Sequence, residues 1–247
     1  MKQDLSQMHI YIDGTQLKRV GNDCVEHSTK FLGIHLDENL TWKHHIIYMN
    51  KRISRALFAL KQVKFTLPLD CLRTLYYALI HSHLSYGTIA WGTADKQYIN
   101  SSMTLQKRAM RILHNTPYNG HTDPLFKTSK ILKLPDVYEY QMVLFMQDYM
   151  SGILPDSFEG IFTLNRDLPN ARQTRQSHLY HIPRCNKRFS RRLPLYSLPC
   201  IWNKHALHFP INPSRYQVKR IFKSKAMESY ADTVKCKNDR CMQCNQN

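Results

Sequence analysis

The sequence predicts a mainly α-helical chain of the α+β class, with a small N-terminal β-hairpin, a helical bundle and an irregular basic C-terminal region. Three observations lead to this fold class. Apolar residues recur at three- and four-residue intervals in several segments between residues 41 and 152. A short alternating segment around an Asp-Gly pair precedes them. Basic residues and prolines accumulate after Arg166. With 247 residues, 43% of them hydrophobic, the chain can bury a sizeable core.

Residues 1–40 are expected to contain the β-hairpin. Ile10 and Ile12 alternate with polar residues and are followed by Asp13-Gly14, a residue pair typical of a tight hairpin turn. A further strand is predicted over residues 31–36, in which glycine at position 33 would allow another backbone segment to approach closely.

Residues 41–152 are expected to form the helical bundle. The first helix should begin after Thr41, because threonine is a good N-cap residue. The second should run from about Pro68 to His83, since proline is tolerated in a first helical turn. The third should begin near Asp95. The core of these helices is predicted to include Trp42, Leu57, Leu75, Leu79 and Ile112.

Two further helices are predicted before residue 152. Asp123-Pro124 and Leu134-Pro135 each open one, and Gly152 should end the second by adopting a left-handed conformation. The helix that ends there carries methionine and aromatic residues at helical spacing, which is typical of core packing.

The basic region is predicted at residues 153–235, followed by a cysteine-containing tail at 236–247. Six of the eleven prolines lie between positions 169 and 213, which argues against long regular helices there. Within this region we expect a strand over 178–182, a short helix around Trp202 and a last helix from about Ser214 to Tyr230.

The charge distribution predicts a polyanionic partner. The formal net charge is +17, and residues 166–225 alone hold 14 Lys and Arg against one Asp. A concentration of this kind is typical of nucleic-acid binding. The chain has no run of about 18 apolar residues and no secretory signal pattern, so we expect an intracellular protein without a membrane span.

Several short motifs follow one another along the chain in a characteristic order. They are Lys30-Phe31-Leu32-Gly33-Ile34, Leu40-Thr41-Trp42-Lys43, Leu75-Tyr76-Tyr77-Ala78-Leu79-Ile80-His81, Leu84-Ser85-Tyr86-Gly87, Ala90-Trp91-Gly92 and Leu105-Gln106-Lys107-Arg108-Ala109-Met110-Arg111-Ile112. Their order and spacing resemble the end of the reverse transcriptase of non-LTR (LINE-type, jockey/CR1-like) retrotransposons. More loosely, Ile182-Pro183-Arg184 and Trp202-Asn203 also resemble that family.

This resemblance implies that the helical bundle of residues 41–152 is thumb-like, and it implies roles for specific residues. In reverse transcriptases a hairpin after the catalytic palm, the primer grip, holds the 3′ end of the growing strand. By resemblance, Phe31, Leu32 and Gly33 take that role. The alternative is a β-hairpin that only packs on the helices.

Nucleic-acid contacts are predicted for cations of the bundle and of the basic region. In that region rings alternate with cations, as in proteins that stack bases and bind phosphates. The alternative is a solvated charged surface over a small aromatic core. The predicted cations are Lys43, Arg52, Arg184, Lys187, Arg188, Arg191, Arg192, Lys219, Arg220 and Lys223.

A polymerase needs paired carboxylates on adjacent strands to hold two metal ions, and the sequence contains no Asp-Asp pair; its only adjacent acids are Asp37-Glu38. Tyr230-Ala231-Asp232-Thr233 resembles the catalytic loop of the family, but its fourth position is threonine and it follows a basic helix, so we interpret it as coincidence. In the family that loop lies upstream of the primer grip. The Mg²⁺ ions of the parent polymerase would therefore be held outside this chain.

A zinc site is a second possibility for metal binding. Cys236, Cys241 and Cys244 have a spacing that suits three thiolate ligands, and His205 or His208 could supply a fourth. The alternative is a set of uncoordinated reduced cysteines.

The resemblance implies a C-terminal fragment of an RNA-directed DNA polymerase that binds template RNA and primed DNA without a catalytic palm. Whether the chain is an enzyme stays open at this point. Its expected partners are the RNA template, the DNA primer and the palm and endonuclease domains of the parent polyprotein, within a nuclear or cytoplasmic ribonucleoprotein. The alternative is a stand-alone helical adaptor or RNA-binding protein with a basic tail.

Overall fold

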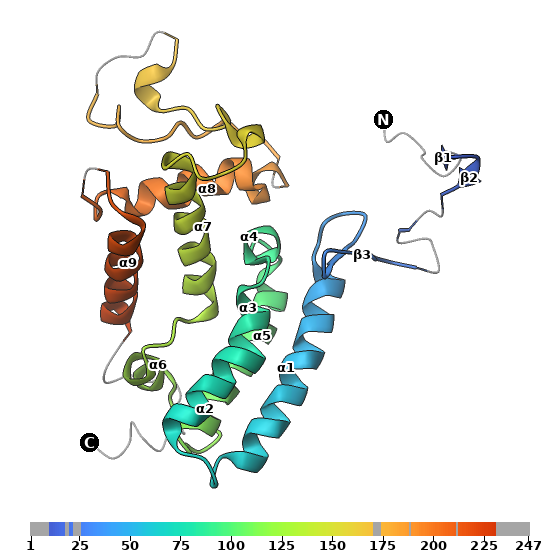
Figure 1. Ribbon diagram of the computed structural model, residues 1–247, viewed down its shortest axis with the longest axis vertical. Helices are drawn as coiled ribbons and strands as arrows, with labels where there is room; N and C mark the ends of the chain where they lie inside the picture. The colour runs from blue at the N-terminus through green and yellow to red at the C-terminus, as the bar shows by residue number, and fades with distance from the viewer. Residues whose placement is uncertain are drawn as a thin grey trace.

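The structure, a computed structural model, describes residues 10–17, 20–21, 26–169, 174–187, 189–210 and 212–230. These residues form a mainly α-helical fold with two small antiparallel hairpins, which confirms the predicted fold class (Figure 1). The elements are β1 (Tyr11–Ile12), β2 (Thr15–Gln16), β3 (Thr29–Phe31), β4 (Ile34–Leu36), α1 (Lys43–Val63), α2 (Leu69–Tyr76), the π-helix η2 (Tyr77–His81), α3 (Ser82–Ser85), α4 (Thr88–Trp91), α5 (Lys96–Leu113), α6 (Asp123–Ser129), α7 (Leu134–Met150), the 3₁₀ turns η3 (Asp156–Phe158), η4 (Asn165–Asp167) and η5 (Ser190–Arg192), α8 (Pro194–Ala206) and α9 (Arg215–Ser229).

The N-terminal segments form two hairpins. Strands β1 and β2 pair around Asp13-Gly14, as predicted. The single strand expected over residues 31–36 is wrong, because the chain turns at Leu32 and Gly33 and places β3 opposite β4. Both turn residues have positive φ, 45° and 82°, a conformation that glycine adopts readily and that ends a strand.

Helix α1 begins at Lys43 and not directly after Thr41. The carboxylate of Asp37 accepts hydrogen bonds from the backbone N–H groups of Thr41 and Trp42, both at 2.9 Å, and from the hydroxyl of Thr41 at 3.1 Å. The prediction of Thr41 as the N-cap is therefore wrong. An upstream carboxylate, itself 7% exposed, holds the chain as it enters the helix.

Helices α1 and α5 lie side by side and run in the same direction. The Asn50 amide donates to the Ser101 hydroxyl (2.9 Å), and Lys64 Nζ donates to Asn115 Oδ1 (2.8 Å). Each pair is separated by 51 residues, so the two helices keep one register over their length. Their carboxyl ends therefore meet at the same end of the bundle (Figure 1).

The second predicted helix is present, but its turns differ from a regular α-helix. The π-helix η2 follows α2 and leads into α3 without a break. The buried side chains Leu72, Tyr76, Ile80 and Leu84 recur at every fourth position, because the wider i→i+5 turn advances the buried face.

This register decides which predicted core residues are buried. Leu79 is 38% exposed, so its assignment to the core is wrong. Leu57 is buried, as predicted, and Trp42, Leu75 and Ile112 are partly buried against the same core.

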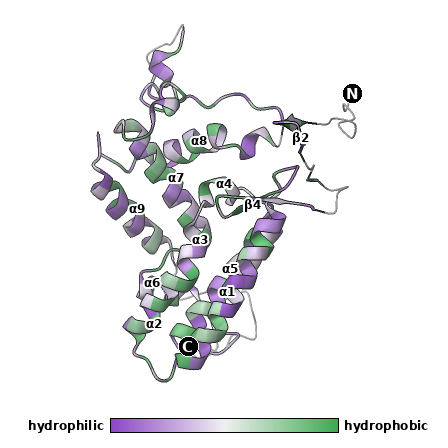
Figure 2. Cartoon of the chain, turned by 45° about the vertical axis from the view of Figure 1, so that its right-hand side comes forward, coloured by the Kyte–Doolittle hydropathy of each residue, from purple (hydrophilic) through white to green (hydrophobic). Residues whose placement is uncertain are grey.

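A second core joins α7 to α8 and α9. Val137, Met142 and Met146 of α7 pack against Trp202 of α8 and Phe222 of α9. Figure 2 shows the corresponding alternation of hydrophobic and hydrophilic residues along α9. The predicted packing role of the methionine and aromatic residues on α7 is confirmed.

Two expectations for the basic region are wrong. Residues 178–182 do not form a strand, and Tyr180 makes only an isolated bridge with Leu164. Long helices do occur, because Pro194 occupies the first turn of α8 and Pro213 precedes α9, where a missing N–H costs little. Pro199 lies inside α8. The last helix, α9, begins as predicted, with a capping box between Ser214 and Gln217.

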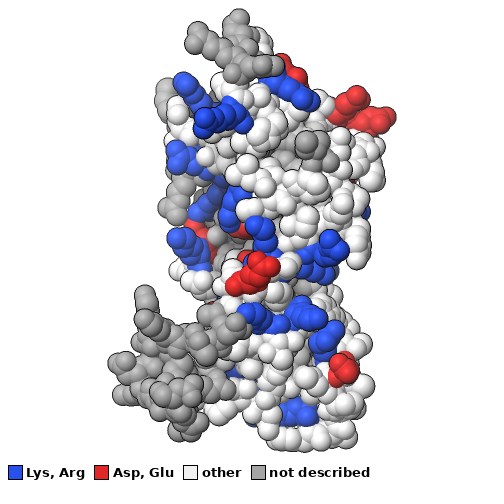
Figure 3. Space-filling model, turned by 90° about the vertical axis from the view of Figure 1, so that its left-hand side faces the viewer, with Lys and Arg blue, Asp and Glu red and all other residues white. Residues whose placement is uncertain are grey.

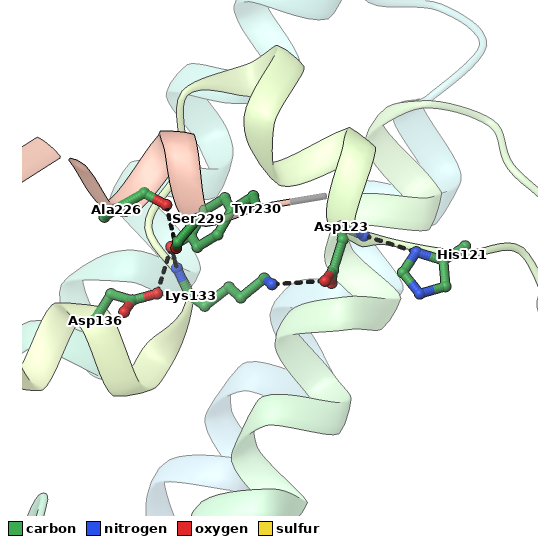
Figure 4. Close-up of polar contacts among 7 residues, drawn as sticks. All are labelled: His121, Asp123, Lys133, Asp136, Ala226, Ser229 and Tyr230. Atoms are coloured by element: carbon green, nitrogen blue, oxygen red, sulfur yellow. Dashed lines mark hydrogen bonds and ion pairs between the residues drawn. The ribbon is translucent and has the colours of Figure 1, made fainter. Parts of the chain in front are cut away.

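The end of α9 is held by Tyr230, the residue after the helix (Figure 4). Its hydroxyl donates to a carboxylate oxygen of Asp136 and accepts a hydrogen bond from the backbone N–H of Lys133 at 2.9 Å. Lys133 Nζ lies 2.9 Å from Asp123 and 4.2 Å from the centre of the Tyr230 ring. Tyr230 is 3% exposed, so these contacts fix α9 to the start of α7. Within the described ranges, no helix is both long and apolar enough to cross a membrane.

Candidate nucleic-acid interface

The β3–β4 hairpin presents its tip to solvent. Phe31 is 62% exposed and Leu32 is 73% exposed, although both are large apolar residues. The hydroxyl of Tyr86, which follows α3, donates to the carbonyl oxygen of Leu32. A Cβ atom at Gly33 would lie 3.4 Å from the ring of the same tyrosine. The tip is therefore held in a defined position with its apolar side chains available for a partner.

A cavity of about 350 Å³ lies beside this tip. The guanidinium of Arg52 lies 4.9 Å from the centre of the Tyr48 ring, and Lys30 Nζ lies 6.0 Å from the same ring. Two cations around one ring can meet a phosphate and leave the ring for a base or sugar. We call this site the hairpin groove; its lining residues are Lys30, Gly33, His45, Tyr48, Met49, Arg52, Ser82, His83 and Tyr86.

The histidines of the hairpin groove are poor cations. Burial, together with a smaller contribution from His35, lowers the pKa of His45 to about 4. Burial also lowers the pKa of His83, with a second contribution from Arg52. The positive charge of the groove at neutral pH therefore comes from Lys30 and Arg52.

The buried neutral His45 predicts acid destabilisation. Its pKa is 6.5 in the unfolded chain and about 4 in the folded protein, so the unfolded state binds more protons between these values. The contribution of neutral His45 to the free energy of unfolding is fully present above pH 6.5 and is lost as the pH falls toward 4. This contribution is at most about 3 kcal/mol. In urea titrations at pH 7.5 and pH 5.0, His45→Gln should reduce the stability difference between the two pH values. The exposed control His178→Gln should leave it unchanged, and an equal pH dependence in all three proteins would contradict the assignment.

Helix α9 carries a second group of predicted cations. Arg220 and Lys223 are exposed and Lys219 is partly exposed, and all three lie on the outward side of the helix. Figure 3, which faces this side of the molecule, shows Lys and Arg side chains gathered over its middle. Lys223 Nζ lies 5.5 Å from the centre of the Tyr140 ring, and this lysine also lowers the pKa of His81, after burial. An aromatic ring therefore accompanies at least one cation, Lys223, here as well.

The cations of α9 and the hairpin groove lie on different sides of the helical part of the structure. Helix α9 lies at the left and the β3–β4 hairpin at the right in both Figure 1 and Figure 2. The structure therefore brings Gly33 and Arg52 together in the hairpin groove but does not bring them to Lys219, Arg220 and Lys223. Lys43, also predicted, is exposed at the start of α1.

The predicted cations between residues 184 and 192 differ in their surroundings. Arg184 and Lys187 are exposed, and Arg188 lies outside the described residues. Arg191 donates to the carbonyl oxygen of Cys185 at 3.3 Å. Arg192 forms an ion pair with Asp95, at the N-terminus of α5, so it fastens η5 to the bundle and is less available to a phosphate.

Sequence reasoning missed a further basic cluster at the carboxyl ends of α1 and α5. A cavity of about 230 Å³ there is lined by four cations together with Tyr118, which is 80% exposed. The guanidinium of Arg111 lies 5.8 Å from the Tyr118 ring centre. Along the sequence these cations belong to two separate segments, at the end of α1 and at the end of α5. Only the parallel arrangement of α1 and α5 brings them together; they are Lys61, Lys64, Arg108 and Arg111.

The described part of the chain does not assemble the predicted zinc ligands or a catalytic loop. The cysteines at 236, 241 and 244 lie outside the described residues. Elsewhere in the described ranges, no three His, Cys, Asp or Glu side chains could hold a metal ion. His205, considered as a fourth zinc ligand, lies 2.8 Å from Glu139. Tyr230 is buried at the end of a basic helix, and Asp232 lies outside the described residues.

The chain is similar to RNA-directed DNA polymerases of transposable elements. A probable RNA-directed DNA polymerase from transposon BS of Drosophila melanogaster is 34% identical over 92 residues, 36% of this chain and 10% of that protein. The RNA-directed DNA polymerase from mobile element jockey of the same species is 28% identical over 111 residues, 43% of this chain and 12% of that protein. The chain thus spans about a tenth of the length of these curated relatives. No family model and no solved structure matches it.

Proposed function

We propose that this chain is the part of a non-LTR retrotransposon reverse transcriptase that follows the catalytic palm, and that it holds template RNA and primed DNA. The observation that carries the proposal is the hairpin groove, where an exposed apolar tip lies beside two cations and an aromatic ring. The similarity to transposon-encoded RNA-directed DNA polymerases supports the same nucleic-acid partners.

Each part of the hairpin groove has a distinct task in this proposal. Phe31 and Leu32 contact the apolar faces of sugars and bases near the primer end. Lys30 and Arg52 bind phosphates, and Tyr48 stacks on a base between them. These contacts position the primer and perform no chemistry, because positioning increases a rate only where catalytic groups act on the same substrate.

The remaining chemistry belongs to other segments of the parent protein in this proposal. A palm supplies the carboxylates and Mg²⁺, and an endonuclease domain belongs to the same polyprotein. The complete assembly is an intracellular ribonucleoprotein. Zinc at Cys236, Cys241 and Cys244 stays a proposal that depends on a fourth ligand.

A second candidate function is a helical adaptor that binds a protein partner. Its supporting observation is a set of exposed apolar residues near the α1–α2 connection: Phe58 is 65% exposed, Phe65 is 77% exposed and Leu69 is 45% exposed. Docking of an apolar partner there would depend weakly on salt, whereas phosphate binding weakens steeply as salt rises.

The test of the first function is the salt dependence of binding to a primed RNA–DNA hybrid. The full chain should bind with an affinity that falls linearly in log K against log salt. Lys30→Gln combined with Arg52→Gln should lower that slope by about two, since each phosphate contact contributes about one. A slope that stays unchanged in the double variant would remove the hairpin groove from the interface. Absence of saturable binding to the hybrid at low salt would favour the adaptor.

A further inference from the structure

A cavity of about 490 Å³ lies where the end of α7 meets η3 and the segment around Tyr180. This volume is within the range of sites that enclose small ligands or parts of peptides. Among the residues that the structure describes, no Lys or Arg lines it. Its lining residues are Tyr149, Met150, Gly152, Leu154, Pro155, Asp156, Phe158, Glu159, Gly160 and Tyr180.

Three aromatic rings of this lining are fixed by their neighbours. The rings of Tyr149 and Tyr180 lie 6.3 Å apart at 67°, and the ring of Phe158 lies 5.5 Å from that of Phe145 at 73°. The backbone of Tyr180 is held on both sides by the amide of Asn203, at 3.0 and 2.8 Å. The cavity therefore presents aromatic faces that are already in place before a ligand arrives.

The cavity lies in a locally acidic part of a basic protein. Residues 134–165 contain five Asp and Glu and no Lys or Arg. Three of the five have partners: Asp136 binds the Tyr230 hydroxyl, Glu139 binds Lys204 and His205, and Asp148 lies 3.2 Å from Arg215.

The two remaining carboxylates, Asp156 and Glu159, both line the cavity. Neither forms an ion pair within the described residues. Two carboxylates beside aromatic rings, with no Lys or Arg of the described ranges lining the site, favour a cationic ligand.

Tyr180 provides an independent sign of a ligand. It is 6% exposed and lines the cavity, and its hydroxyl, which has no hydrogen-bond partner among the described residues, stays accessible there. Burial raises the pKa of this hydroxyl to about 12, so it is neutral at physiological pH and its oxygen can accept a hydrogen bond. The hydroxyl of Tyr149, by contrast, is fully used, because it accepts from the backbone N–H of Phe162 (3.2 Å) and donates to its carbonyl (3.1 Å).

We propose that this cavity binds the guanidinium group of an arginine side chain on a partner peptide. A guanidinium is planar and weakly hydrated, so it stacks on aromatic faces, and it carries five N–H donors in a fixed fork. The carboxylates of Asp156 and Glu159 and the hydroxyl of Tyr180 supply acceptors for those donors. The site is separate from the hairpin groove, and the proposal does not depend on nucleic-acid binding.

The test uses the full chain and the peptide N-acetyl-Gly-Arg-Gly-amide at 0.15 M salt, where long-range repulsion by the basic regions is largely screened. The methyl group of Met150, which lines the cavity, reports local binding by NMR. The arginine peptide should shift this signal saturably. The same peptide with citrulline, which keeps the shape and loses the charge, should bind at least about tenfold more weakly, and so should the lysine peptide.

Variants then assign the binding to the proposed groups. Asp156→Asn combined with Glu159→Gln should weaken binding at least about tenfold, and Phe158→Leu should weaken it as well. The matched control is Asp167→Asn, because Asp167 pairs with Arg166 and does not line the cavity. Equal affinity for the arginine and citrulline peptides would overturn the proposal. Equal affinity for arginine and lysine, an unmoved Met150 signal, or an unaffected Asp156/Glu159 double variant would also overturn it.

Discussion

Replacing Lys219, Arg220 and Lys223 of α9 by glutamine is expected to lower the slope of log K against log salt by about three for binding to RNA–DNA hybrid or single strands. Each of these cations can neutralise one phosphate and release a counterion. Between 50 and 200 mM salt, three units of slope correspond to about a 60-fold difference in how much affinity is lost. Filter binding or fluorescence anisotropy over that range measures the slope.

Substitution is preferable to deletion for this experiment. Removing residues 166–225 would take away Trp202 and Phe222, which pack against α7 in the second core. A matched triple variant, with glutamine for the exposed residues Arg73, Lys96 and Lys130, removes the same net charge elsewhere on the surface. If both triple variants lower the slope equally, the lower slope results from the change in the protein's net charge. The assignment of α9 as a phosphate-binding helix would then be wrong.

Gln106→Leu is expected to destabilise the protein by about 4 kcal/mol or more, although leucine has a similar size and a better helix propensity. Gln106 is completely buried on α5. Its amide donates to the Tyr76 hydroxyl and to the carbonyl oxygen of Leu132, both at 2.9 Å, and its oxygen accepts the backbone N–H of Leu134 at 2.8 Å. Leucine would leave three buried polar groups without partners, at about 1–3 kcal/mol each.

Urea denaturation monitored by circular dichroism measures this loss. The matched control is Gln97→Leu, an exposed position on the same helix, which should change the stability by less than about 0.5 kcal/mol. Since Gln106 links α5 to α2 and to the start of α7, the variant should also lower the cooperativity of unfolding. Equal midpoints for the two variants would mean that this network contributes little.

Local chemistry made several features predictable from the sequence. Asp13-Gly14 predicted a hairpin turn, and Ser214 marked the start of α9, because each depends on neighbouring residues alone. The segments of α1, α5 and α7 were also predicted, since an amphipathic stripe shows in the spacing of apolar residues. The local concentration of charge after Arg166 was likewise a property of the sequence.

Other features depend on contacts between distant residues. The turn at Leu32–Gly33 split a predicted strand into β3 and β4, and its tip is held by Tyr86, 54 residues further on. Leu79 is exposed and not part of the core, because η2 adopts a π-helical turn. The sequence could not show this, since the apolar spacing of Leu75, Leu79 and Ile80 suits more than one helical register.

The sequence by itself therefore determined the helical class, the helix positions and the concentration of basic charge, because these follow from neighbouring residues. Only the tertiary structure decided which charges act together. The parallel packing of α1 and α5 brought Lys61 close to Arg111. The packing of the end of α7 and the η3 segment near Tyr180 placed Asp156 and Glu159 beside aromatic rings. The physical reason is that periodicity states which face of a helix is apolar, whereas the partner of that face is set by packing between elements distant in sequence.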